Sequence, residues 1–168
     1  MSLPFEYESV TPGEFGGTKP TTTDFENARV VILPVPLDRT TSYVPGTRLG
    51  PHEILVASSH MELWDEETET DVHSVGIYTM PEMELPCGTM DEVVKEIRRV
   101  TAEIVKRDKF PVVLGGEHSI TPPVVAAIAA TAGPVIECSP PSRTGNFPCA
   151  TISVVTRRIS RTMSSIEE

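Results

Sequence analysis

The segment Gly115–Ser119, with the sequence GGEHS, contains the residues best suited to chemistry in this chain. Its two glycines follow a run of apolar residues and permit a tight turn in which the backbone approaches another group closely. His118 comes directly after this turn, and imidazole is a common metal ligand. The alternative is a histidine hydrogen-bonded within a loop. Spacing alone favours that alternative, because one histidine does not make a metal site.

A second polar group lies in residues 35–54, VPLDRTTSYVPGTRLGPHEI, between an apolar run and an expected helix. Its glycines allow backbone angles that other residues rarely adopt. Long loops with a fixed turn pattern are often functional, but a solvated connection that only starts a helix fits these residues equally well. The polar side chains that are candidates for ligand contact here are Asp38, Thr40, Ser42 and Arg48.

Two apolar runs position these polar groups. Residues 29–35 (RVVILPV) and 110–114 (FPVVL) are short and continuous, as is typical of strands buried on both faces of a parallel sheet. Pro34 and Pro36 are expected to end the first strand, because proline cannot donate to a sheet ladder. Ligands bind at the carboxyl ends of the strands in open α/β sheets, so we expect both polar groups on one rim.

Helical patterns alternate with these strands. Helices are expected over residues 51–63, over residues 89–106 and over residues 121–132, and a short strand is expected at 74–78. The second helix begins with a capping box, in which a threonine and a glutamate satisfy free N–H groups. Alternating strands and helices predict right-handed βαβ units, and therefore an α/β fold with a mostly parallel sheet.

The composition excludes several classes of partner. The 168 residues carry a formal net charge of −10, so neither nucleic acid nor an anionic membrane is an expected partner. The three cysteines have no C-x-x-C spacing, and no export signal is visible, so we expect a cytoplasmic protein. The first 27 residues, rich in proline, glycine and threonine, are expected to form an irregular arm.

Together the two polar segments resemble the agmatinases of the ureohydrolase (arginase) family. Residues 36–54 fit P-x-D-x-T-x-S-Y-x-P-G-x-R-x-G-P-x-x-I and residues 111–121 read P-V-V-L-G-G-E-H-S-I-T, in the family's order, with similarity over about residues 28–135. The resemblance implies a three-layer α/β/α fold and hydrolysis of a small guanidino substrate, such as agmatine to putrescine and urea in polyamine synthesis. Guanidinobutyrate, guanidinopropionate and formiminoglutamate are the alternative substrates within the family.

The resemblance also implies a cofactor and a role for His118. In the family a pair of Mn²⁺ ions holds the hydroxide that attacks the guanidinium carbon, and the histidine of the GGEHS motif is one metal ligand. A manganese pair suits carboxylate oxygens plus a few imidazoles, and it lowers the pKa of bound water. The polar loop would contact the substrate. The family commonly forms trimers or hexamers, so a homo-oligomer is a further expectation.

The sequence departs from the family after residue 135, where D-A-H-x-D should follow. It has no aspartate after Asp108 and no histidine after His118, so Mn²⁺ is not expected to be fully bound. We therefore expect an apparently truncated family domain that is inactive as written. A non-catalytic partner of a full-length homologue is the alternative function.

Residues 136–168 differ in composition from the rest, with four arginines, no lysine and ten serines plus threonines. We expect a disordered or frame-altered tail in which only residues 151–155 resemble a strand. A reading frame that departs near codon 136 is our hypothesis, and a divergent paralogue is the alternative. An unpaired sheet edge and uncovered helix faces would make the product poorly soluble.

Overall fold

The computed structural model describes residues 9–10, 14–17, 24–132, 135–138 and 151–157. At its centre is a five-stranded sheet with the strand order β5-β2-β7-β9-β8. These strands are β2 (Val30–Val35), β5 (Ile77–Thr79), β7 (Phe110–Gly115), β8 (Val135–Cys138) and β9 (Thr151–Arg157). β5, β2 and β7 are parallel, whereas β9 is antiparallel to both β7 and β8. Within the described sheet, β9 alone is reversed, so the predicted mostly parallel sheet is confirmed.

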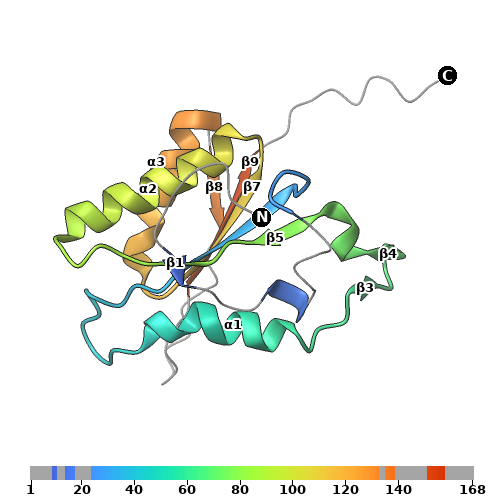
Figure 1. Cartoon of the computed structure of the whole chain (residues 1–168), viewed down its shortest axis with the longest axis horizontal. Coiled ribbons are helices and arrows are strands. Elements are labelled where there is room, and N and C mark those ends of the chain that lie inside the picture. Colours follow the sequence, from blue (N-terminus) through green and yellow to red (C-terminus); the bar gives the residue numbers. More distant parts are fainter. Residues whose placement is uncertain (1–8, 11–13, 18–23, 133–134, 139–150, 158–168) are drawn as a thin grey trace.

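Helices cover both faces of the sheet (Figure 1). α2 (Met90–Lys106) and α3 (Thr121–Ala132) pack against each other on one face, and α1 (Gly50–Ser58) lies on the other. The described chain is therefore a three-layer α/β/α fold, as expected from the sequence. None of its described helices combines the length and hydropathy needed to span a membrane.

Alternate side chains of β2 and β7 build two hydrophobic cores. Val31 and Leu33 of β2 lie in the larger core, with residues of α2 and α3. Ile32 lies in the smaller core, with Leu55 of α1 and Leu114 of β7. Successive residues of a strand point to opposite faces, so a strand with helices on both faces is apolar throughout. This is why the two continuous apolar runs predicted the central strands correctly.

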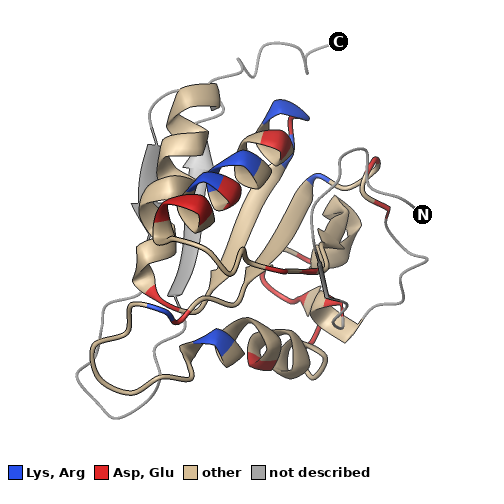
Figure 2. Cartoon of the chain, turned by 60° about the vertical axis from the view of Figure 1, so that its left-hand side comes forward, with Lys and Arg blue, Asp and Glu red and all other residues tan. Residues whose placement is uncertain are grey.

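α2 begins at the predicted capping box. The Thr89 hydroxyl accepts a hydrogen bond from the Glu92 N–H at 3.4 Å, and the Glu92 carboxylate accepts one from the Thr89 N–H at 3.1 Å. Charged residues of both signs lie along the outer side of the helix (Figure 2). The buried residues of the opposite side are Val93, Ile97, Val100, Thr101, Ile104 and Val105. This amphipathic pattern located the helix from the sequence.

α1 is shorter than predicted, since it ends at Ser58 and not near residue 63. The buried Ser58 hydroxyl donates to the Leu55 carbonyl at 2.6 Å. The N–H groups of Ser59 and His60 bond to carbonyls only three residues back, which tightens the chain beyond α-helical geometry. Serine side chains that compete for backbone acceptors favour a helix end. The prediction of a helix over 51–63 was therefore wrong beyond Ser58.

Pro34 does not end its strand, contrary to the prediction. β2 continues to Val35, which pairs with Gly115 of β7 and accepts a hydrogen bond from the Gly116 N–H. The backbone N of Pro34 therefore faces the other edge of β2. There β5 pairs only as far as Ile32, so the ladder needs no donor from Pro34.

β5 begins later than the predicted strand at 74–78, because residues Val72–Val75 form a 3-10 helix. Asp71 caps this helix by accepting a hydrogen bond from the His73 N–H at 2.9 Å. The turn that follows has Gly76 at a φ of 77°, a conformation that favours glycine. The cap at Asp71 and the turn at Gly76 therefore favour a 3-10 helix over a strand for residues Val72–Val75.

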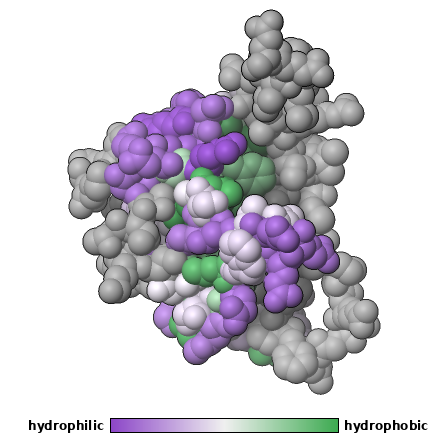
Figure 3. Space-filling model, turned by 90° about the vertical axis from the view of Figure 1, so that its right-hand side faces the viewer, coloured by the Kyte–Doolittle hydropathy of each residue, from purple (hydrophilic) through white to green (hydrophobic). Residues whose placement is uncertain are grey.

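The acidic segment before this 3-10 helix contains a short hairpin of β3 (Trp64–Asp65) and β4 (Thr70–Asp71). Exposed hydrophobic side chains accompany it. Trp64 is 56% exposed and Val72 is 46% exposed. Figure 3 shows hydrophobic groups among hydrophilic ones on one face of the molecule.

The residues before β2 take part in the fold. β1 (Ser9–Val10) pairs with β6 (Glu82–Met83), and the 3-10 helix Phe15–Gly17 contacts α1. Phe25 is buried in the larger core, edge-on to Tyr78. The described parts of the predicted irregular arm are therefore packed onto the domain.

The strand predicted at 151–155 is present as β9, and it pairs with β7 over Val112–Gly115. The outer edge of β7 is therefore covered, where we expected an unpaired edge. Hydrogen bonds to β9 satisfy backbone groups that would otherwise offer a template for association. The domain boundaries after residues 27 and 135 remain predictions.

Candidate functional site

Two loops leave the sheet side by side. β2 and β7 are parallel neighbours and Val35 pairs with Gly115, so the loop of residues 36–49 and the turn of residues 116–117 start from the same edge. The first loop, here called the β2 loop, ends in the 3-10 helix Thr47–Leu49 before α1. The predicted placement of both polar groups on one rim is confirmed.

The backbones of the two loops touch at Gly116. The Gly116 N–H donates to the Val35 carbonyl at 3.2 Å, and the Glu117 N–H donates to the Leu37 carbonyl at 2.8 Å. A Cβ atom on Gly116 would lie 2.1 Å from the Leu37 carbonyl oxygen. Only glycine fits at this position, so the close backbone approach predicted for the glycine pair is confirmed here.

The Glu117 side chain joins the two loops and is only 7% exposed. Its Oε2 accepts a hydrogen bond from the Thr40 N–H at 2.7 Å. Its Oε1 accepts one from the Thr40 hydroxyl at 2.7 Å and one from the Ser119 hydroxyl at 2.5 Å. These three donors compensate the carboxylate for its loss of water. Glu117 was not among the predicted site residues. Its place inside GGEHS put it on the rim, but nothing in the sequence indicated its burial or its partner Thr40.

His118 is exposed on the rim. It begins the 3-10 helix His118–Ile120, which leads directly into α3. Its Nδ1 lies 3.4 Å from the hydroxyl oxygen of Thr121. This distance is at the upper limit of a hydrogen bond, so the contact holds the ring only weakly. Because the residue is exposed, the imidazole is accessible from solvent.

Asp38 closes the β2 loop on itself. Its Oδ2 accepts hydrogen bonds from the Gly46 N–H at 2.9 Å and from the Arg48 guanidinium at 2.8 Å. Burial alone would raise the pKa of Asp38, but the hydrogen bonds from Gly46 and Arg48 outweigh burial and lower it. Gly46 has a φ of 122°, a conformation that favours glycine. The charges of Asp38 and Arg48 are therefore paired with each other, whereas the third charged residue of the loop, Arg39, donates to the Gly88 carbonyl at 3.3 Å.

Thr40 and Ser42, the remaining candidates of the β2 loop, lie in different surroundings. Thr40 is tied through Glu117 to the turn that carries His118. Ser42 is exposed, and its neighbour Tyr43 is 88% exposed at the tip of the β2 loop. The structure therefore brings Thr40 and His118 to one rim, pairs Asp38 with Arg48, and leaves Ser42 facing solvent.

The described residues do not assemble a metal site. No group of three or more His, Cys, Asp or Glu side chains in the described ranges is arranged to hold a metal ion. Glu117, beside His118, already accepts three hydrogen bonds, and Asp38 is paired with Arg48. A manganese pair needs several oxygen ligands as well as imidazole. One accessible imidazole does not fit that requirement, so no chemical step is assigned to a metal on these residues.

Residues 28–138 match the model of the arginase family, which closely agrees with the similarity predicted over residues 28–135. The match covers more than half of the chain and includes both loops of the rim. The fold and the rim place the chain among α/β proteins with three layers, in which loops at the carboxyl ends of parallel strands form the site. Within that class, the chain belongs to the arginase family.

Curated relatives carry ureohydrolase names. The N(1)-aminopropylagmatine ureohydrolase of Thermus thermophilus is 39% identical over 105 residues, and the agmatinase of Bacillus cereus is 33% identical over 105 residues. Each match covers 62% of this chain and 36% of the relative. The chain therefore spans about a third of the length of the curated relatives it matches.

Solved structures show the same fold. The agmatine ureohydrolase of Thermoplasma volcanium is similar with a TM-score of 0.60 and 26% identity, over 74% of this chain and 39% of that one. The proclavaminate amidino hydrolase of Streptomyces clavuligerus reaches a TM-score of 0.64 at 22% identity, over 76% of this chain and 42% of that one. The arginase-like fold expected from the sequence is thereby confirmed.

Proposed function

We propose that this chain supplies the N-terminal part of the active site of an agmatinase-type ureohydrolase, which hydrolyses agmatine to putrescine and urea. The observation that carries the proposal is the meeting of the β2 loop and the turn after β7 on one rim, both within the family match. In this proposal His118 is a metal ligand. The β2 loop, with Asp38, Thr40, Ser42 and Arg48, frames the guanidino end of the substrate.

The proposal assigns His118 one place in a larger set of donors. The arginase family is generally manganese-dependent, but the other donors of such a set are absent from the described rim. The sequence also has no aspartate after Asp108. We therefore expect the 168-residue chain to release no urea by itself.

A second candidate substrate is N(1)-aminopropylagmatine. Relatives with this substrate in their names are 39% and 40% identical to the chain, whereas the Bacillus cereus agmatinase is 33% identical. Both substrates present a guanidino group to the rim and differ at the opposite end. In this proposal the described residues frame the guanidino group, which both substrates have. The structure therefore does not discriminate between them, and urea release must be measured with each compound.

Three further properties belong to this proposal: a role in polyamine synthesis, a cytoplasmic location and assembly as a homo-oligomer. The names of the relatives support the first property. A non-catalytic partner of a full-length homologue is the competing function. Co-purification of the chain with such a homologue, without urea release, would favour the competing function.

A chimera tests the enzymatic proposal. Residues 28–135 of this chain replace the equivalent segment of the full-length Bacillus cereus agmatinase, and urea release from agmatine is measured with Mn²⁺. We expect an active chimera. His118→Asn in it should lower activity by more than about 100-fold, because loss of an outer partner of a metal ligand alone costs about 10–100-fold and loss of the ligand itself should cost more. His60→Asn, an exposed histidine beyond α1, is the control that should keep full activity. A folded but inactive chimera, or an active His118→Asn chimera, would contradict the proposal.

A further inference from the structure

We propose that Glu117 is a latch, a positioning residue that fixes the β2 loop to the turn carrying His118. Its carboxylate would then bind neither the metal nor the substrate. The inference rests on the proposed function only for the statement that the two loops form one site. The latch itself follows from the contacts of Glu117 with Thr40, Ser119 and Leu37.

The carboxylate of Glu117 has little capacity left for a ligand. A carboxylate offers about four acceptor positions on its two oxygens. Three of them are taken by donors at 2.5–2.7 Å, and the residue is 7% exposed. A cation bound here would leave Thr40 and Ser119 without their acceptor in a largely buried place, which is unfavourable. The geometry therefore assigns the carboxylate to holding the protein together.

The latch couples two segments that lie far apart in the chain. Thr40 and Glu117 are 77 residues apart, whereas Ser119 and His118 directly follow Glu117. The backbone bond from the Glu117 N–H to the Leu37 carbonyl fixes the base of the loop, and the side chain fixes Thr40. Glu117 thus holds Thr40 against the turn that carries His118, and the neighbouring Arg39 has a separate bond to the Gly88 carbonyl at 3.3 Å.

The β2 loop has a separate internal brace, which makes the effect of the latch local. Asp38 binds Gly46 and Arg48 through hydrogen bonds that do not involve Glu117. Loss of the latch should therefore free residues 38–42 from the rim, while α2 and the sheet keep their packing. This local effect distinguishes a latch from a residue that only stabilises the fold.

Amide hydrogen exchange of the purified full chain tests the latch. The Thr40 N–H is the reporter, because it donates to Glu117. Glu117→Gln keeps the size of the side chain but turns one acceptor into a donor. We expect exchange in residues 38–42 to become roughly tenfold faster, with α2 unchanged, because a buried charge-assisted hydrogen bond is lost. Trypsin should also cleave faster after Arg39. Glu53→Gln, an exposed glutamate on α1, is the matched control and should change neither rate.

A second pair of variants keeps the test decisive if Glu117→Gln does not fold. Thr40→Val removes only the hydroxyl bond and should speed amide exchange in residues 38–42 by roughly threefold. Thr40→Ser keeps the hydroxyl, so exchange in these residues should stay at the rate of the parent chain. Unchanged exchange at residues 38–42 would overturn the latch. An equal increase in α2 would show general destabilisation and would also overturn it. These measurements need neither metal nor substrate, so their failure is distinct from failure of the chimera.

Discussion

At the scale of single residues, Gly116 determines how closely the two loops of the rim can pack. Gly116→Ala would place a Cβ atom 2.1 Å from a backbone oxygen of Leu37, which cannot move without the loop. We expect a loss of about 2 kcal/mol in the free energy of unfolding, the usual cost of overpacking, measured by urea denaturation. Gly88→Ala is the control, because only the flexible end of Glu92 is in its way. That change would displace the exposed capping bond from Glu92 to the Thr89 N–H but no backbone, so it should cost less than Gly116→Ala. Equal stability of Gly116→Ala and the parent chain would contradict the close approach.

Residue types predicted some of this site and not the rest. The glycine pair and His118 could be found because they follow a recognisable strand within five residues of one another. The hydrogen bonds of Glu117 could not be found, because Thr40 is 77 residues away and a buried acid has no signature in a single sequence. The pairing of Asp38 with Arg48 was missed as well, since polar loop residues suit solvent and ligands equally well.

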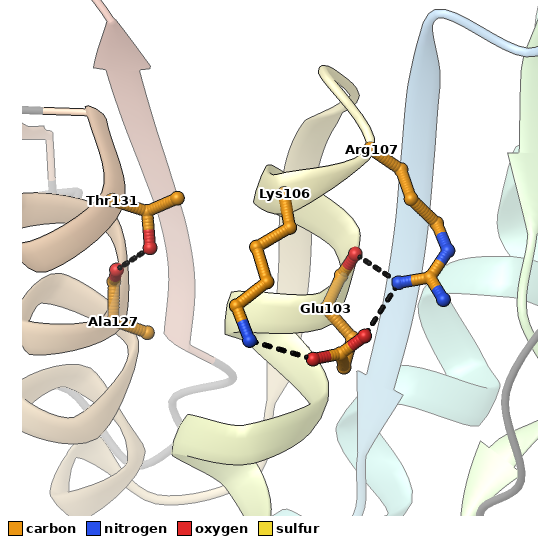
Figure 4. Close-up of polar contacts among 5 residues, drawn as sticks. All are labelled: Glu103, Lys106, Arg107, Ala127 and Thr131. Carbon is orange, nitrogen blue, oxygen red and sulfur yellow. Dashed lines mark hydrogen bonds and ion pairs between the residues drawn. The ribbon is translucent and has the colours of Figure 1, made fainter.

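At the scale of secondary structure, the last turn of α2 contains an ion-pair cluster around Glu103 (Figure 4). Its carboxylate accepts hydrogen bonds from Arg107 at 2.6 Å and Lys106 at 2.9 Å, which lower the pKa of Glu103 to about 2. A carboxyl group with a lowered pKa stabilises the fold above its ordinary pKa of 4.5 and loses that effect as the pH falls toward 2.

We therefore expect Glu103→Gln to destabilise the chain by about 0.2–1 kcal/mol at neutral pH, the range for such partly exposed pairs. The deficit should shrink as the pH falls from about 4.5 toward 2, where the parent carboxylate is protonated too. Urea denaturation at several pH values measures this difference. Glu84→Gln, an exposed glutamate outside the helices, serves as control. A deficit that stays constant with pH would show that packing, and not charge, is responsible.

Elements with strong local patterns were predictable, and elements decided by distant contacts were not. The stripe and capping box of α2, and the apolar runs of β2 and β7, are local. The passage of β2 through Pro34 depends on where its neighbour β5 ends, 45 residues later in the sequence. The antiparallel pairing of β9 with β7 likewise depends on a contact between distant segments, which periodicity cannot reveal.

At the scale of the whole molecule, the family match ends at residue 138, close to the change in composition near residue 136. β9 follows that point and covers the outer edge of β7. The hypothesis of an altered reading frame near codon 136 stays a prediction, and D-A-H-x-D in another frame of the underlying DNA would support it. Under the proposed function, the described residues would supply one ligand to a manganese site, the imidazole of His118.

The manganese content of the purified chain tests this central claim most directly. The chain is equilibrated with Mn²⁺, freed of unbound ion by dialysis and measured by elemental analysis. We expect well below one equivalent of manganese per chain, because one imidazole cannot hold a divalent pair. One or two tightly held manganese ions per chain would contradict the claim that the chain lacks the further ligands that a manganese pair needs beside His118.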